Sequence, residues 1–250
     1  MNYWKNKAKT SIRGKIGIFF VISLITSFQA FLNVDYSNIL SIINEQLIVN
    51  ETGYYIPKEI INAFLILGII SVVITFLLNA VFSLSNHYVY IKLVYEEKVK
   101  ISDSFYGFKD FGSAVKLYFL MGLYISLWSM LFYIPGIIKS YEYSMAPYIL
   151  ANNPGMSPNE CLRKSKEMTN GYKFSLFLLD LSFIGWNLLS VLTLGILSIW
   201  VNPYYQASKA YAYLEMNSDN LDDENDIDDD DDEDNIDDDE SFNEETNDVQ

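Results

Sequence analysis

The stretch IINAFLILGIISVVITFLLNAVFSLS, residues 60–85, decides the fold of this chain. It holds no charged side chain, and Ile, Leu, Val and Phe dominate it. A helix needs roughly 20 apolar residues to cross the hydrocarbon core of a bilayer, which is about 30 Å thick. A surface helix of a soluble protein would carry a polar stripe, whereas this stretch carries only isolated Ser, Thr and Asn. The sequence therefore predicts a membrane-spanning helix here.

On both sides of this stretch, five further stretches are predicted to span the membrane. The fold class that we expect is all-α, a polytopic transmembrane helix bundle of about six spans. The spans are expected near residues 16–33, 60–85, 117–134, 137–151, 174–193 and 196–214. The first follows a basic stretch, as in a signal peptide, but no small-residue cleavage site follows it, so we interpret it as a retained span.

A helical hairpin is predicted around Pro135-Gly136, because proline and glycine together favour a turn. Its arms are short for a bilayer, and the second arm carries two charged residues. A re-entrant or interfacial course for 137–151 therefore stays open. The last stretch, 196–214, is interrupted by Asn, Pro, Gln and Lys, and its second half could instead follow the inner membrane surface.

Basic residues alternate between the connections, which predicts the orientation of the chain. They are frequent before the first span, between the second and third, and before the fifth, and they are rare in the other connections. This alternation requires an even number of crossings with both termini in the cytoplasm. The expected localisation is the plasma membrane, as a multi-pass protein.

Acidic residues gather at the C-terminus. The segment from Glu215 to Gln250 holds 20 of the 32 Asp and Glu and no Lys or Arg, so 12 acids and all 17 bases remain before it. Seven acids follow one another from Asp228 to Asp234. So many charges with few apolar residues cannot offset the entropy of ordering. We expect a transmembrane domain over 1–215 and a disordered acidic tail over 216–250.

A short amphipathic helix is predicted at the inner surface, before the fifth span. Ser157 is suited to cap its start, Pro158 to occupy its first position and Glu160 to complete a capping box. Asn170-Gly171 is a natural stop. Cys161, Leu162, Ser165 and Met168 fall on one side of this helix, and most of its charged residues fall on the other. Contact of its bases with lipid phosphates and a plain elbow between spans are equally compatible with this pattern.

Several motifs in one order resemble the DUF975 family of bacterial integral membrane proteins of unknown function. The resemblance extends from about Trp4 to Leu214. It rests on IPGIIK (134–139), YSMAPYILA (143–151), Asn153-Pro154, LSFIGW (181–186), LTLG (192–195) and Pro203-Tyr204. It implies a polytopic membrane protein and supplies neither a reaction nor a site residue. The acidic tail lies outside it.

Asp180, Glu142 and Lys139 are the candidate polar site within the membrane. A carboxylate inside a span costs a few kcal/mol, so it commonly faces protein or water and marks a functional site. Glu142 and Lys139 lie three residues apart on one helical face. The simpler interpretation, which we favour, is that Asp180 lies near enough to the start of its span for water or Lys173 to satisfy it.

No catalytic or cofactor site is predicted. The single cysteine, Cys161, excludes an internal disulfide, and the single histidine, His87, has no nucleophile motif beside it. Phosphate-binding loops and metal-ligand spacings are absent from the sequence, so we expect no enzyme, no cofactor and no metal. The expected partners are membrane lipids and further membrane proteins, without nucleic acid. The favoured function is a structural or accessory protein of the bacterial cell envelope. The alternative is a small transporter or channel-like carrier that uses the intramembrane polar residues.

Overall fold

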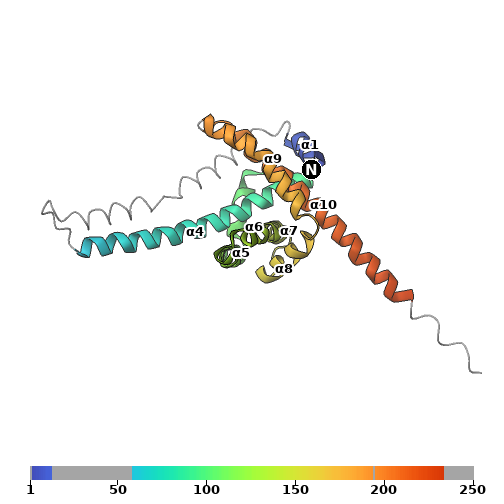
Figure 1. Ribbon diagram of the computed structural model, residues 1–250, viewed down its shortest axis with the longest axis horizontal. Coiled ribbons are helices and arrows are strands. Elements are labelled where there is room, and N and C mark those ends of the chain that lie inside the picture. Colours follow the sequence, from blue (N-terminus) through green and yellow to red (C-terminus); the bar gives the residue numbers. More distant parts are fainter. Residues whose placement is uncertain (1, 13–57, 194, 234–250) are drawn as a thin grey trace, which may run out of the picture.

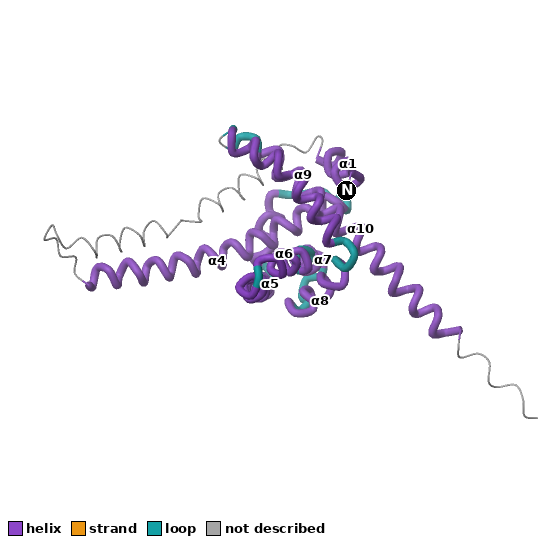
Figure 2. Tube along the Cα trace, in the orientation of Figure 1, coloured by secondary structure: helices purple, strands orange, loops and turns teal. Residues whose placement is uncertain are grey.

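The structure is a computed structural model that describes residues 2–12, 58–193 and 195–233 (Figure 1). Within these ranges the chain is helical and contains no strand, as Figure 2 shows, which confirms the all-α class. The elements are α1 (Asn2–Ile12), α4 (Lys58–Val94), the 3₁₀ helix η1 (Ile101–Phe108), α5 (Phe111–Leu131), α6 (Tyr133–Glu142), α7 (Ala146–Asn152), α8 (Pro158–Met168), α9 (Lys173–Leu192) and α10 (Ser198–Glu233).

Three described helices are long and apolar enough to cross a membrane: Leu65–Val94 within α4, Phe111–Leu131 (α5) and Lys173–Leu192 (α9). These helices overlap three predicted spans. The span 60–85 is covered from residue 65 on, the span 117–134 up to residue 131, and the span 174–193 up to residue 192. The predicted span 16–33 lies outside the described residues. Three candidate spans are thus established among the six that the sequence predicts.

The core lies where the C-terminal half of α4, the short helix α7, one face of α8 and the middle of α10 meet. Leu84, Leu93, Tyr148 and Ala210 are among its fully buried members. The longer helices leave this centre in different directions: α4 leads to the left of the picture, α5 is seen nearly end-on, and α10 leads to the lower right (Figure 1). The described helices therefore diverge from a packed centre, and a bundle of about six spans is not confirmed.

α4 joins two unlike environments in one continuous helix. Its 37 residues extend over about 55 Å at 1.5 Å per residue, well beyond the thickness of a hydrocarbon core. In its first half, Ile66 and Ile69 are 57% and 66% exposed, whereas in its second half Leu84 and Leu93 are fully buried. Between residues 65 and 76 every residue except Gly68, Ser71 and Thr75 is apolar, as expected for a helix in lipid.

The structure differs from the single predicted span 137–151. α6 and α7 are separate helices, and Tyr143, Ser144 and Met145 form the break between them. α6 has 10 residues and α7 has 7, so neither reaches the roughly 20 residues that a crossing requires. α7 is also buried from Ala146 to Ala151, which places it in the protein core.

The helical hairpin is formed by α5 and α6, but its turn lies before Pro135-Gly136. Phe132 has an extended backbone, with φ −152° and ψ 140°, and ends α5. Pro135 follows in the first turn of α6, where the missing backbone donor costs nothing. Gly136 lets the two arms approach, because a Cβ there would lie 2.0 Å from the Ser129 Oγ and 2.8 Å from its Cα.

α10 differs from the predicted last span and from the predicted tail. It begins at Ser198, continues through Pro203 and ends at Glu233. No helix end lies at the expected boundary between residues 215 and 216. The chain from 234 to 250 lies outside the described residues, so a disordered tail is not confirmed.

α8 confirms the serine cap and the proline start that the sequence predicts. The Ser157 Oγ accepts a hydrogen bond of 3.3 Å from the Glu160 backbone N–H, and Pro158 begins the helix. Its buried residues are Pro158, Cys161, Leu162, Ser165 and Met168. The predicted apolar side therefore faces the protein, and the predicted charged side faces outward.

Candidate functional site

Asp180 is held by three side chains from two other helices. Its Oδ2 accepts a hydrogen bond of 3.1 Å from the Tyr141 hydroxyl of α6. Its Oδ1 accepts one of 2.8 Å from the Tyr205 hydroxyl of α10 and lies 3.4 Å from the Lys209 Nζ. Three-quarters of the carboxylate side chain and four-fifths of the lysine are withdrawn from solvent. The charge on α9 is therefore neutralised and hydrogen-bonded inside the protein.

Glu142 forms a second charged cluster one residue away from Tyr141. Its two carboxylate oxygens bind Lys139 on the same helix, at 2.5 Å, and Lys173 at the start of α9, at 2.7 Å. The Glu142 side chain is only 8% exposed. Its backbone carbonyl also accepts a hydrogen bond of 2.6 Å from the Ser165 hydroxyl of α8. Glu142 thus ties α6 to both α8 and α9.

Two polar contacts join α6 and α9, and each helix supplies the carboxylate of one contact and the donor of the other. α6 supplies the carboxylate of Glu142 to Lys173, and α9 supplies the carboxylate of Asp180 to Tyr141. Because each helix presents one carboxylate and one donor to the other, sliding or rotation of α6 against α9 would break both contacts. A buried carboxylate with complete partners stabilises one arrangement of its helices.

The sequence-based candidates are placed close together but not paired as expected. Lys139 and Glu142 do form the predicted three-residue pair. Asp180 contacts neither of them through an ion pair, because Lys209 is its cation. Lys173, the partner considered for Asp180, binds Glu142 instead. The structure therefore assembles two adjacent charge clusters where the sequence suggested one.

Three residues of the site were not predicted from the sequence: Lys209, Tyr205 and Tyr141. Lys209 seemed only to interrupt a weak last span. Tyr205 and Lys209 are four residues apart, which places them on one helical face, so a carboxylate partner could have been sought for that face. Tyr141 precedes Glu142 and offered no signal of its own.

A separate buried polar network joins α4 and α5 beside α7. The His87 ring nitrogen Nδ1 lies 2.6 Å from the Ser83 carbonyl, and the Tyr118 hydroxyl donates to the Ser83 Oγ at 2.9 Å. The Tyr148 ring packs edge-on against His87, with 4.4 Å between the ring centroids. Tyr148 is 1% exposed, and its hydroxyl has no hydrogen-bond partner within the described part of the chain. The network orients aromatic rings and offers no activated nucleophile.

Within the described part of the chain, Cys161 and the acidic residues do not form a reactive or metal-binding centre. Cys161 is fully buried on α8, and burial raises the pKa of its thiol to about 11. A thiol with this pKa stays protonated at neutral pH and is a poor nucleophile. Among residues 2–12, 58–193 and 195–233, no cluster of three His, Cys, Asp or Glu side chains is arranged to hold a metal ion.

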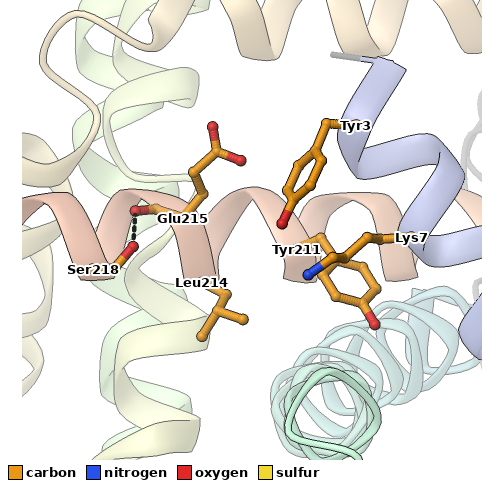
Figure 3. A pocket seen from close by; sticks show the side chains of 6 residues that line it. All are labelled: Tyr3, Lys7, Tyr211, Leu214, Glu215 and Ser218. Carbon is orange, nitrogen blue, oxygen red and sulfur yellow. Dashed lines mark hydrogen bonds between the residues drawn. The ribbon is translucent and has the colours of Figure 1, made fainter.

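A hollow of about 400 Å³ opens between α1 and α10 (Figure 3). Its lining combines two aromatic rings, two opposite charges, an aliphatic side chain and a hydroxyl. These residues are Tyr3, Lys7, Tyr211, Leu214, Glu215 and Ser218. None of the candidates Asp180, Glu142 and Lys139 lines it. The hollow is therefore a feature separate from the two charge clusters.

Comparison with known proteins identifies the family of the chain. The model of the family DUF975, described as a protein of unknown function, matches residues 2–139 and 130–220. No curated protein and no solved structure matches the chain. The matched residues include all three candidate spans and both charge clusters, and they end within α10. The chain therefore belongs to the DUF975 family.

Proposed function

We propose that the protein is a multi-pass protein of the bacterial plasma membrane with a structural or accessory role in the cell envelope. The observation that carries this proposal is the continuous apolar surface of the first half of α4. Leu67, Ile70 and Val73 are 61%, 49% and 51% exposed there. Leaving one fully exposed apolar side chain in water costs about 1.5 to 3 kcal/mol relative to burial, so a whole helix surface of this kind requires lipid or protein around it.

Similar surfaces on the other two candidate spans support the same proposal. On α5, Leu127 and Leu131 are 58% and 67% exposed, and on α9, Leu188 and Leu192 are 67% and 79% exposed. An apolar patch of this extent is unusual on a soluble monomer. It is normal where hydrocarbon replaces water.

The arrangement of the charges favours the structural role over transport. A carrier needs a carboxylate that exchanges a proton or an ion with a pathway. Asp180 and Glu142 are each occupied by cations and hydroxyl donors of the protein itself. Both carboxylates connect helices that lie far apart in the sequence, which is what a fixed scaffold requires. In this proposal the protein catalyses no reaction and binds no cofactor, and its partners are lipids and neighbouring membrane proteins.

The orientation is tested by cysteine labelling. In a Cys161→Ser background, cysteines are introduced singly at Asn50 and Asn217 and exposed to a membrane-impermeant maleimide in intact cells. With both termini in the cytoplasm, position 50 should react from outside, and position 217 should react only after the membrane is opened. Reaction of position 217 in intact cells would contradict an even number of crossings. Extraction of the protein by alkaline carbonate would contradict membrane integration itself.

The role is tested by flux measurements on purified protein. Proteoliposomes that contain the wild type or the Asp180→Asn variant are given a proton gradient and then a potassium gradient. A structural protein should leave the decay of both gradients equal to that of empty liposomes. A decay that is faster with wild type and returns to the empty-liposome rate with Asp180→Asn would support the carrier instead.

A further inference from the structure

The walls of the hollow are built by docking of the N-terminal helix on the C-terminal one. The Trp4 indole N–H donates a hydrogen bond of 2.6 Å to the Glu215 Oε2. One turn further along α1, Ala8 is fully buried, and the Ser11 hydroxyl is hydrogen-bonded to the Tyr211 hydroxyl. Trp4 is only 2% exposed. These contacts fix the position of α1, so the side chains beside the contact line face a defined space.

Opposite charges face that space without neutralising each other. The Lys7 ammonium lies 5.0 Å from the centroid of the Tyr3 ring and 6.0 Å from that of Tyr211. Among the described residues, no ion pair joins Lys7 to Glu215 or to any other carboxylate. In Figure 3 the Tyr3 ring lies between the two charged groups. The hollow thus presents a cation at one end, a carboxylate at the other and aromatic rings between them.

We propose that this hollow binds a zwitterion that carries a phosphate at one end and a primary ammonium group at the other. Lys7 supplies a positive charge and hydrogen-bond donors to the phosphate. Glu215 accepts from the ammonium group, which at the same time lies against the electron-rich face of Tyr3. Ser218 lies at the rim beside Glu215 (Figure 3). A simple anion would meet the negative charge of Glu215, and a simple cation would meet the lysine, so neither satisfies both ends.

This chemistry occurs in two sources, the headgroup of phosphatidylethanolamine and soluble phosphoethanolamine. The lipid source rests on the proposed membrane location, whereas the soluble source does not. Measurements in detergent and in bilayers therefore separate them. Extraction of the protein by alkaline carbonate would contradict membrane integration and leave the soluble measurement fully interpretable.

Trp4 provides the reporter, because its indole is hydrogen-bonded to one of the proposed ligand groups. The other tryptophans, Trp128, Trp186 and Trp200, are replaced by phenylalanine in the full chain. Fluorescence of Trp4 is then titrated in detergent with phosphoethanolamine, ethanolamine and inorganic phosphate. The same protein is placed in nanodiscs of phosphatidylcholine that contain increasing fractions of phosphatidylethanolamine or phosphatidylglycerol.

Three variants test the assignment of the two ends. Lys7→Gln removes the cation, and Glu215→Gln removes the charge while its amide oxygen still accepts from Trp4. Lys9→Gln is the matched control, because Lys9 is an exposed lysine of the same helix that does not line the hollow. Circular dichroism of each variant checks that the fold is retained, and Lys7→Arg, which keeps the charge, should bind nearly as well as the wild type.

The expected result is a saturable change with phosphoethanolamine, with phosphatidylethanolamine, or with both. Its Kd should rise about tenfold or more in Lys7→Gln and in Glu215→Gln, as expected for loss of one charge-assisted contact, and stay unchanged in Lys9→Gln. A response to only one source would identify that source. The absence of a saturable response in both media would overturn the proposal. So would equal binding of inorganic phosphate or phosphatidylglycerol, or an unchanged Kd in Glu215→Gln.

Discussion

Replacing Asp180 by asparagine should destabilise the protein by roughly 1 to 3 kcal/mol. The change preserves the size of the side chain and removes the charge that faces Lys209, 3.4 Å away. At this distance the Coulomb attraction is about 5 kcal/mol with an effective dielectric constant of about 20. The cost of removing both charges from water offsets much of this attraction in the native pair. In the variant, Lys209 stays 17% exposed and loses its counter-charge, so its desolvation is no longer compensated.

The hydrogen bonds add to the expected loss. The carboxylate accepts from both Tyr141 and Tyr205, whereas an asparagine side chain has one accepting oxygen and one donating NH₂ group. One of the two tyrosine hydroxyls must then turn to accept, or it loses its partner at a cost of about 1 kcal/mol. The lost hydrogen bond is already included in the destabilisation expected for Asp180→Asn.

The assay is SDS-induced unfolding in mixed detergent micelles, followed by circular dichroism, with a double-mutant cycle. Asp180→Asn, Lys209→Met and the double variant are compared with the wild type. Because the double variant strands no charge, its loss should be smaller than the sum of the single losses by about 1 kcal/mol or more. The matched control is Glu167→Gln, which breaks an exposed pair with Arg163 whose side chains are 54% and 61% exposed.

The control should change the free energy of unfolding by no more than about 0.5 kcal/mol. The reasoning would be refuted if Asp180→Asn behaved like this control, or if the losses at positions 180 and 209 were additive. Either result would mean that solvent, and not Lys209, satisfies the carboxylate of Asp180.

Three further predictions concern the local geometry. Gly107→Ala should destabilise the protein by about 1 to 3 kcal/mol in a thermal-shift measurement, because the new Cβ would lie 2.1 Å from the Val81 carbonyl oxygen of α4. Gly112→Ala, which has open space around its Cβ position, should be neutral or slightly stabilising in the same measurement. Gly136→Ala should loosen the α5–α6 hairpin and speed hydrogen exchange in both arms, and Gly122→Ala, on the same hairpin but with nothing near its Cβ position, should not. Ser157→Ala should lower the free energy of unfolding by about 1 kcal/mol, because the hydrogen bond that caps the Glu160 N–H is lost. Ser157→Asp can still cap the helix and should keep the stability of the wild type. An equal loss of stability in both variants would argue against the cap.

Long, uniformly apolar helices could be predicted from the sequence because their signal is local. The stretch 60–85 and the stretch 174–193 needed only their composition, and the Ser157 cap needed only four residues. The break between α6 and α7 was missed because its residues, Tyr143 to Met145, are compatible with a helix. It follows instead from packing, since α7 is buried among helices that are distant in the sequence.

The candidate site was predicted in part for the same reason. The Lys139–Glu142 pair is a contact within one helix and follows from spacing. The pairing of Asp180 with Lys209 depends on how α9 and α10 meet, and that geometry is set by the whole core. Sequence reasoning could identify Asp180 as a charge in need of a partner, and it could not choose among the available lysines.

The partners of Asp180 also impose an order on the assembly of the protein during synthesis. A chain emerges from its N-terminus, so Tyr141 precedes α9, whereas Tyr205 and Lys209 follow it. In the proposed membrane location, the carboxylate of α9 has only one of its three ligands when this helix first reaches the bilayer, and it lacks its counter-charge. An unpaired carboxylate within hydrocarbon is costly, so α9 is expected to stay near the interface until α10 is complete. Complete insertion of α9 therefore depends on synthesis of α10. A ribosome that stalls between the two helices would leave α9 incompletely inserted.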